Sequence, residues 1–417
     1  MTMLDAPQAS LFDLPLPPPL NDARRIMASQ TMWAEQDLIA MCLALMGWQA
    51  GLSAAECKLA STSPAVSLNL RDVDGVRSQI LAGGDPLGDA FSTIRSAQDR
   101  RAAGAVYTPH PIVRSMMAWL ASQGTPTRVV DPGAGSGRFI LAAGEMFPDA
   151  HLEAVEMDPL AALMLRANLS VRGWAGRVTV MVDDYRKINL PPHVGVTAFI
   201  GNPPYVRHHE IALAWKDWYA SRFAHFGIKA SALAGLHLHF FLQTCLLAKK
   251  GDVGAFITSA EWMDVNYGSA LRGLLLKELG GIALHVLEPT VAAFPGIATT
   301  AAITCFRVGE IAEPIRVRSV AELVQLNGLT DGTDIARDRL QAEPRWSIIV
   351  RPNAPNTDGV IELGELFRVH RGQVTGANDI WHGGRWGSRR RHPSSAPIWR
   401  AGHLNSRSTP AMRSIST

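Results

Sequence analysis

The residues with the clearest capacity for chemistry form a short turn, Asn202-Pro203-Pro204-Tyr205, directly after an apolar run at residues 196–200. An amine conjugated to an aromatic ring or a carbonyl is a poor nucleophile, because its lone pair is delocalised. Two acceptors that each take one N–H would localise that lone pair and aim it at a methyl sulfonium. The turn offers the side-chain oxygen of Asn202 and the backbone carbonyl of Pro203, and the fixed backbone of the prolines holds both in place.

Tyr205 adds an aromatic surface on which the acceptor ring could lie, at a gain of about 1 kcal/mol beyond burial. This scheme needs no metal, covalent nucleophile or strong base. The turn could therefore prepare a conjugated amine to accept a methyl group. The alternative is a plain proline turn that ends a strand beside a core tyrosine.

A glycine loop, DPGAGSG, runs from Asp131 to Gly137, between a strand pattern and a helix pattern. Glycines such as Gly133 and Gly135 let a ligand approach the backbone and the exposed N–H groups at the start of a helix. By itself the loop fits a dinucleotide, a nucleoside or simply a tight turn.

Acidic residues end the next two strand patterns. Glu156 lies about 20 residues beyond the glycines, where a carboxylate can accept hydrogen bonds from the ribose of a nucleoside cofactor. Asp183 and Asp184 end the following strand and could reach the base. Because the carboxyl ends of parallel strands share one edge of a sheet, we expect a single nucleoside-binding crevice there. Asp158 has the alternative role of capping the next helix.

The elements that must position these residues alternate between strand and helix patterns from Pro109 onward. This alternation predicts an α/β fold in which helices cover both faces of a mostly parallel sheet. The seven strand patterns lie at residues 127–132, 152–158, 177–185, 196–205, 253–259, 282–288 and 299–308.

Composition and charge are those of an ordinary globular protein, with 47% hydrophobic and 18% charged residues among 417. The longest apolar segment, residues 232–248, contains two histidines and a glutamine, so we expect a buried helix and not a membrane span. The scattered Cys42, Cys57, Cys245 and Cys305 have neither disulfide nor metal-ligand spacing, which is typical of the cytoplasm. The net charge is +3, and residues 381–417 contain seven arginines and no acidic residue. Residues 1–380 therefore carry −4, so any basic face on them must be local.

Six segments of the chain together resemble the gamma-class N6-adenine DNA methyltransferases of restriction–modification systems, and the resemblance runs from about Gly104 to Asp379. The segments that carry the resemblance are AVYTPHPIVRSM, VVDPGAGSGRF, VEMDP, DDY, GNPPYVR and AFPGIATTAAITCF. The resemblance implies a class I methyltransferase (Rossmann-like) sheet of seven strands, one of them antiparallel. It also implies S-adenosyl-L-methionine as cofactor, bound by Tyr107, Thr108, Pro109, Asp131, Gly133, Gly135, Glu156 and Asp184. Pro204 is included with Asn202, Pro203 and Tyr205 in the catalytic motif.

The resemblance further implies double-stranded DNA as partner, with the target adenine flipped between Tyr205 and Phe294. Arg207 is a candidate for a DNA phosphate contact, with a solvated surface arginine as the alternative. We expect a cognate restriction endonuclease as a further partner, no membrane partner, and a cytoplasmic location.

We interpret the organisation as five segments. They are a proline-rich flexible leader (1–20), a helical N-terminal region (21–100), the methyltransferase catalytic domain (101–310), the start of a target-recognition domain (311–380) and an Arg/Ser/Pro-rich, disordered tail (381–417). Residues 346–350, WSIIV, read as a strand of the fourth segment. Because the family continues into a long recognition domain, our hypothesis is that the reading frame is truncated or shifted soon after Asp379.

Several other functions remain as alternatives. Transfer to cytosine N4 is chemically close, whereas cytosine C5 transfer lacks a Pro-Cys nucleophile. A protein-glutamine methyltransferase also uses this turn on a conjugated amide, and an inactive remnant would keep only cofactor or DNA binding. A metal site built from His208, His209, His237 and His239 lacks carboxylates at ligand spacing, so we expect no metal.

Overall fold

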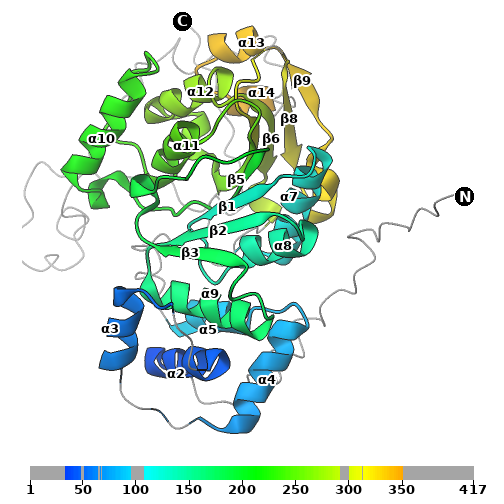
Figure 1. The fold of residues 1–417 in the computed structure, drawn as a ribbon. Coiled ribbons are helices and arrows are strands. Elements are labelled where there is room, and N and C mark those ends of the chain that lie inside the picture. The colour runs from blue at the N-terminus through cyan, green and yellow to red at the C-terminus, as the bar shows by residue number, and fades with distance from the viewer. Residues whose placement is uncertain are drawn as a thin grey trace, which may run out of the picture. The chain divides into compact units, whose positions relative to one another are not determined.

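The computed structural model describes residues 33–47, 51–63, 66, 68–94, 108–291, 300–311 and 313–350, which all belong to one compact unit (Figure 1). Tyr107 and Phe294, two of the expected site residues, lie outside the described residues. The expected leader, residues 351–380 of the expected recognition segment and the expected tail also lie outside them.

A nine-stranded sheet in the order β3-β2-β1-β4-β5-β7-β6-β8-β9 forms the centre of this unit. Its strands are β1 (Arg128–Pro132), β2 (His151–Glu156), β3 (Val178–Val182), β4 (Thr197–Gly201), β5 (Val253–Ser259), β6 (Gly281–Leu287), β7 (Ala301–Arg307), β8 (Ile315–Val320) and β9 (Thr333–Ile335).

The direction of the strands follows the sequence prediction. Neighbours from β3 to β5 run parallel, and β7 is antiparallel to both β5 and β6. The mostly parallel α/β sheet is therefore confirmed, but seven strands is wrong as a total. β8 pairs with β6 in parallel and β9 pairs with β8 antiparallel, so two strands extend the sheet.

The sheet thus continues past residue 310, where we expected a second domain to begin. The strand expected at residues 346–350 is wrong as well, because these residues form part of the short helix α14 (Ser347–Val350) and the turn before it. There the Trp346 indole donates to the carbonyl of Leu340 at 2.9 Å, and the Trp346 backbone N–H donates to that of Met263 at 3.1 Å. These tertiary contacts override the strand preference of the β-branched run.

Helices cover both faces of the sheet (Figure 1). On one face α7 (His110–Ser122), α8 (Arg138–Met146) and one side of α9 (Pro159–Val171) share a core with Val129. On the other face α10 (Leu213–Ala224), α11 (Leu236–Leu247) and α12 (Ser269–Leu276) share a core with Val130. Adjacent residues of β1 belong to different cores because side chains alternate along a strand.

The apolar segment at residues 232–248 forms α11, whose residues are almost all buried, as expected. Among the described residues no helix is long and apolar enough to cross a membrane. After β9, the short helix α13 (Arg337–Ala342) follows and leads to α14.

In the described part of the chain, four helices precede α7: α2 (Glu35–Met46), α3 (Ala54–Thr62), α4 (Leu70–Leu81) and α5 (Pro86–Ile94). They lie in the region for which the sequence predicts helices, and they pack around the side of α9 that faces away from the sheet (Figure 1). Leu165 of α9 belongs to the core with the sheet, whereas Leu163 and Met164 belong to the core with the N-terminal helices. α9 is therefore buried between two layers.

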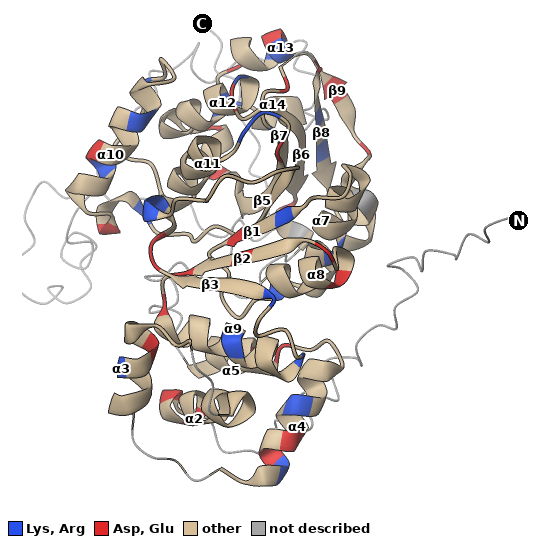
Figure 2. Ribbon diagram, in the orientation of Figure 1, with Lys and Arg blue, Asp and Glu red and all other residues tan. Residues whose placement is uncertain are grey.

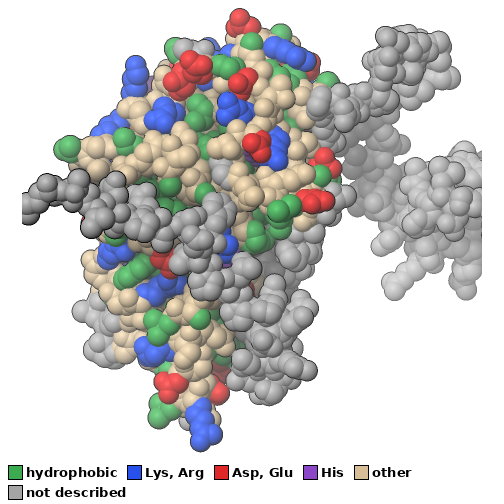
Figure 3. All heavy atoms as spheres, turned by 90° about the vertical axis from the view of Figure 1, so that its right-hand side faces the viewer, with side chains coloured by type: hydrophobic (Ala, Val, Ile, Leu, Met, Phe, Trp, Pro, Cys, Tyr) green, Lys and Arg blue, Asp and Glu red, His purple; other side chains and the backbone are tan. Residues whose placement is uncertain are grey.

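Charged side chains of both signs are spread over the described elements. Figure 2 shows blue and red together on α4 and on α10. In the space-filling view, acidic, basic and hydrophobic side chains are interspersed over the described part of the face shown (Figure 3). Neither view shows a broad basic face on the described residues, which agrees with the charge distribution in the sequence.

Candidate active site

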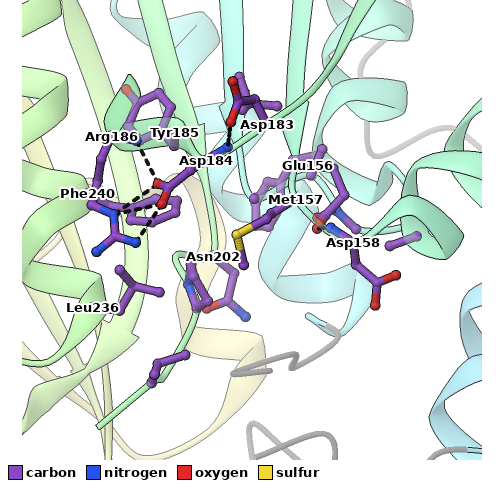
Figure 4. A pocket seen from close by; sticks show the side chains of 18 of the residues that line it. Glu156, Met157, Asp158, Asp183, Asp184, Tyr185, Arg186, Asn202, Leu236 and Phe240 are labelled. Carbon is purple, nitrogen blue, oxygen red and sulfur yellow. Dashed lines mark hydrogen bonds and ion pairs between the residues drawn. The ribbon is translucent and has the colours of Figure 1, made fainter. Parts of the chain in front are cut away.

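A pocket of about 390 Å³ lies at the carboxyl ends of β1, β2, β3 and β4 (Figure 4). Residues from five separate sequence motifs line it, among them Thr108 and Asn202, which are 94 positions apart in the chain. They include Thr108, Gly133, Gly135, Glu156, Asp184, Asn202 and Pro204. The single crevice that the sequence predicts at this edge of the sheet is thus present.

The glycine loop follows β1 and leads into α8. Gly133 and Gly135 have φ angles of +74° and +58°, which favour glycine, and both line the pocket. A Cβ on Gly133 would lie 3.5 Å from Cδ of Pro204, so the loop directly contacts the proline turn. Gly137 caps α8 at a φ of +101°, and a Cβ there would collide with Leu165 of α9. The loop is therefore tightly packed between the turn and α9.

Glu156 at the end of β2 ties the loop to the next strand. Its Oε2 accepts from the backbone N–H of Gly135 at 2.8 Å, and its Oε1 accepts from that of Asp158 at 2.8 Å. Burial raises the pKa of Glu156, while hydrogen bonds from these two N–H groups lower it. Since each carboxylate oxygen has two lone pairs, Glu156 can still accept from hydroxyl groups in the pocket.

Two other acidic residues near the pocket have structural partners. Oδ1 of Asp158 accepts from the N–H of Leu160 at 2.9 Å, so Asp158 caps α9, as its alternative role predicted. Asp131 is fully buried and its Oδ2 accepts from the N–H of Ile140 at 3.1 Å. Among the described residues, Asp131 is not part of the pocket wall; it joins the end of β1 to the first turn of α8.

Asp184 lines the pocket beside an arginine and an indole ring. Arg186 binds its carboxylate from Nε at 2.9 Å and from Nη2 at 2.6 Å, and the guanidinium lies 3.9 Å from the ring centroid of Trp215. Asp184 also accepts from the backbone N–H of Arg186, which caps the 3-10 helix η2 (Tyr185–Lys187). Asp183 points to a more exposed position, where it accepts from the N–H of Asp184 (Figure 4).

Asn202 follows β4 directly, at the centre of the pocket. Its Nδ2 donates to Oγ1 of Thr108 at 3.1 Å, and Thr108 is only 3% exposed just before α7, whose N-cap is Pro109. Figure 4 shows Asn202 and Met157 pointing into the same space between the acidic strand ends. Asn202 is thus held by the segment upstream of the glycine loop.

In the rest of the turn Pro203 is buried, whereas Pro204 and Tyr205 are partly buried. Pro204 is part of the pocket wall, whereas Pro203 and Tyr205 are not, as far as the described residues form it. The Tyr205 ring stacks on His237 of α11, with centroids 6.1 Å apart and planes inclined by 29°. Burial raises the pKa of Tyr205 and lowers that of His237 to about 4, so both side chains are neutral near pH 7.

Known proteins match this chain in sequence. The family model described as Eco57I restriction-modification methylase matches residues 192–282, which include the proline turn. The type II methyltransferase M.XamI of Xanthomonas campestris pv. amaranthicola is 71% identical over 356 residues, covering 85% of this chain and 67% of that protein. This chain belongs to the type II methyltransferases of restriction–modification systems. It is a DNA methyltransferase, as the sequence motifs predict.

More distant proteins share parts of this methyltransferase. The tRNA1(Val) (adenine(37)-N6)-methyltransferase of Aliivibrio fischeri is 33% identical over 84 residues, which cover 20% of this chain and 35% of that protein. The crystal structure of the type IIG restriction endonuclease BpuSI has a TM-score of 0.53 and 16% identity, and the match covers 76% of this chain and 44% of that chain. The expected class I methyltransferase fold is confirmed, and the match to M.XamI decides against the protein-glutamine alternative.

Some expected site residues of the methyltransferase are not part of the pocket. Arg207 is exposed at the start of the 3-10 helix η3 (His208–Glu210) and does not line the described wall.

His237 and His239 are buried in α11, and the described residues contain no group of three or more His, Cys, Asp or Glu that could hold a metal ion.

Sequence reasoning missed four residues that the structure places in or beside the pocket. Met157 follows Glu156 and points into it, and Phe91 of α5 forms part of its wall (Figure 4). Arg138, next to the glycine loop, binds Asp85, which immediately precedes α5. The acidic Asp85 and Asp89 stand out in an otherwise apolar helical stretch of the sequence. Nothing in the sequence indicates that their partner is Arg138.

Proposed function

We propose that this methyltransferase transfers the methyl group of S-adenosyl-L-methionine to N6 of adenine in DNA. The observation that carries the proposal is that Asn202 and Pro204 line the same pocket as Gly135 and Glu156. A nucleoside cofactor held by the glycine loop would thus lie beside the acceptors of the proline turn.

The residues of the pocket fit such a cofactor. Glu156 would accept from the ribose hydroxyls, and Asp184 would accept from the amine of the cofactor adenine, with Met157 against the base. Gly133, Gly135 and Thr108 would contact the methionine part, as would Tyr107 and Pro109 in the segment around Thr108. Asp131 would act through the loop, because it holds the start of α8. When bound, the cofactor supplies a methyl group on a positively charged sulfur.

Asn202 and Pro203 would prepare the target amine. Oδ1 of Asn202 and the carbonyl of Pro203 would each accept one N–H of the adenine amine, so that its lone pair leaves the ring system and points at the methyl carbon. N6 would take the methyl group that the bound cofactor supplies, the electron pair of the broken S–C bond would stay on the sulfur, and one N6 proton, held by Oδ1 of Asn202 or the Pro203 carbonyl, would pass to solvent water. Because the acceptors are fixed before the reaction, little reorganisation is needed.

The target adenine would leave the duplex to reach this turn, at a cost of roughly a few kcal/mol. Tyr205 and Phe294 would stack on its two faces, and Arg207 would contact a DNA phosphate from its exposed position. The name of the tRNA relative specifies N6 of adenine, which favours adenine over cytosine N4 as the target. A cognate restriction endonuclease would cut the same DNA sequence when it is unmethylated, and both enzymes would act in the cytoplasm.

Parallel assays with labelled S-adenosyl-L-methionine test the acceptor class. One assay contains unmethylated DNA and the other contains a glutamine-rich protein acceptor. We expect label on DNA alone, and label on the protein alone would overturn the proposal.

A further inference from the structure

The N-terminal helices reach the glycine loop through one buried carboxylate. Asp85, at the start of α5, is 6% exposed and accepts from Oγ of Ser136 at 2.6 Å and from Nε of Arg138 at 2.7 Å. It also accepts from the N–H of Gly88 at 3.0 Å. Ser136 and Arg138 are the residues on either side of Gly137, so Asp85 binds the end of the loop where it becomes α8.

A second residue holds the same part of the loop from the other side. Asn168 of α9 is 1% exposed, and its Nδ2 donates to the carbonyl of Ser136 at 2.9 Å and lies 3.4 Å from Oδ1 of Asp85. Ser136 is thus bound through both its side chain and its backbone. Its own exposure is 1%, and a Cβ on Gly88 would collide with Asp85 and Ser136. α5 and the loop are therefore in close contact.

We propose that Asp85 is a positioning residue that holds the glycine loop in its cofactor-binding shape, so that the N-terminal helices form part of the cofactor site. Phe91, six residues further along the chain in α5, lines the pocket itself. Among the described residues Asp85 does not itself line the pocket, so its effect on the cofactor passes through Ser136 and Arg138, which do.

The same connection continues to the catalytic turn. Arg138 binds Asp89 of α5 through Nη2 at 2.7 Å, and its Nη1 donates to the carbonyl of Thr108 at 3.1 Å. Oγ1 of Thr108 in turn accepts from Asn202. Hydrogen bonds thus run without a break from α5 through Arg138 and Thr108 to Asn202. Loss of Asp85 would disturb the loop first and the turn second.

A buried carboxylate is costly unless every lone pair is used, so this position needs its partners. The chain offers a matched control. Glu56 of α3 is fully buried and binds Nε of Arg166 on α9 at 2.7 Å, and it also accepts from the N–H of Ser53. This pair joins the same N-terminal helices to the same helix, but neither residue lines the pocket.

The test compares D85N with E56Q in the full chain. For D85N we expect the Kd and KM for S-adenosyl-L-methionine to rise about tenfold, equivalent to about 1.4 kcal/mol, with the KM for DNA unchanged. For E56Q we expect a change in the Kd below about twofold, even where its loss of thermal stability equals that of D85N. S136A removes only one of the hydrogen bonds to Asp85, so we expect it to raise the Kd for S-adenosyl-L-methionine by a smaller factor than D85N does.

Amide hydrogen exchange of residues 133–138 without cofactor provides a readout that does not depend on the proposed function. We expect faster exchange there in D85N and S136A than in E56Q. Equal exchange in D85N and E56Q, or an equal rise in their Kd values, would overturn the positioning role. If D85N does not fold, S136A with unchanged exchange and unchanged Kd would overturn it. No cofactor binding by the unaltered protein would instead overturn the proposed cofactor.

Discussion

Asn202 and Thr108 are joined by a hydrogen bond of 3.1 Å from the side-chain amide to the threonine hydroxyl. This bond directs Nδ2 of the carboxamide toward Thr108, and Oδ1 on the other side of the group is the atom that accepts hydrogen bonds. Thr108 is buried and its carbonyl is bound by Arg138, so it cannot move freely. The segment upstream of the glycine loop therefore orients Asn202, the proposed catalytic residue, and also borders the pocket.

Removal of the Asn202 side chain should abolish most transfer and spare cofactor binding. Loss of one fixed acceptor for the developing charge reduces turnover by about 100-fold to 1,000-fold in comparable sites. We expect N202A to show that loss in labelled methyl transfer to DNA, with the Kd for S-adenosyl-L-methionine within about threefold of the unaltered protein. Turnover that stays normal would show that Asn202 is not the acceptor.

A change of Thr108 should act through Asn202. T108V keeps the shape of the side chain and removes only the hydroxyl, so we expect turnover to fall about fivefold, in line with one lost hydrogen bond of about 1 kcal/mol. T108S keeps the hydroxyl and is the control, for which we expect turnover close to normal. Equal turnover in the two variants would mean that the hydrogen bond has no part in catalysis.

The assignment of Asp184 to the cofactor adenine can be tested with a cofactor analogue. S-inosyl-methionine carries a carbonyl oxygen in place of the adenine amine, so at that position of the ring it presents an acceptor instead of an N–H donor to the carboxylate. We expect the unaltered protein to bind this analogue at least about 100-fold more weakly than S-adenosyl-L-methionine, because a site built for a donor rejects a ligand that lacks it. D184N should bind both weakly and discriminate much less in calorimetric titrations. Full discrimination by D184N would point to Asp183.

Asp131 predicts a pH dependence of stability. Its complete burial raises the pKa well above the ordinary value, and the hydrogen bond from Ile140 lowers it only in part. Below about pH 4 the carboxyl group is neutral in the folded and unfolded states. As the pH rises, the unfolded chain loses this proton first, so stability falls until the pH passes the folded pKa of Asp131 and stays lower above it.

D131N cannot titrate and can still accept from Ile140. Its free energy of unfolding relative to the unaltered protein should therefore rise between pH 4 and pH 7, by about 1.4 kcal/mol for each unit of the pKa shift. Urea unfolding at several pH values measures this difference. A constant offset would show that Asp131 is ionised in the folded state with a nearly ordinary pKa.

Most of the sheet and the location of the pocket could be predicted from the sequence. Central parallel strands are buried on both faces, so runs such as residues 196–200 stand out, and their ends meet at one edge. Glycines such as Gly133 and Gly137 marked the loop, because its backbone adopts positive φ angles that favour glycine. The local chemistry of a turn or strand end is visible in a single segment of sequence.

Long-range packing could not be predicted in this way. The run after Trp346 has a strand composition, yet contacts with Leu340 and Met263 make it helical. Asp85 and Arg138 are 53 residues apart, and nothing in either segment shows that they meet. The pairing of Asp184 with Arg186 was hidden for a different reason, because a neighbouring arginine could equally face the solvent.

The identity of the methylated nucleoside tests the central claim most directly. Unmethylated DNA is incubated with the full chain and methyl-labelled S-adenosyl-L-methionine, digested to nucleosides and analysed by mass spectrometry, with N202A in parallel. We predict label in N6-methyldeoxyadenosine for the unaltered protein and about 100-fold less or none for N202A. Label in N4-methyldeoxycytidine, or equal label with N202A, would contradict the account.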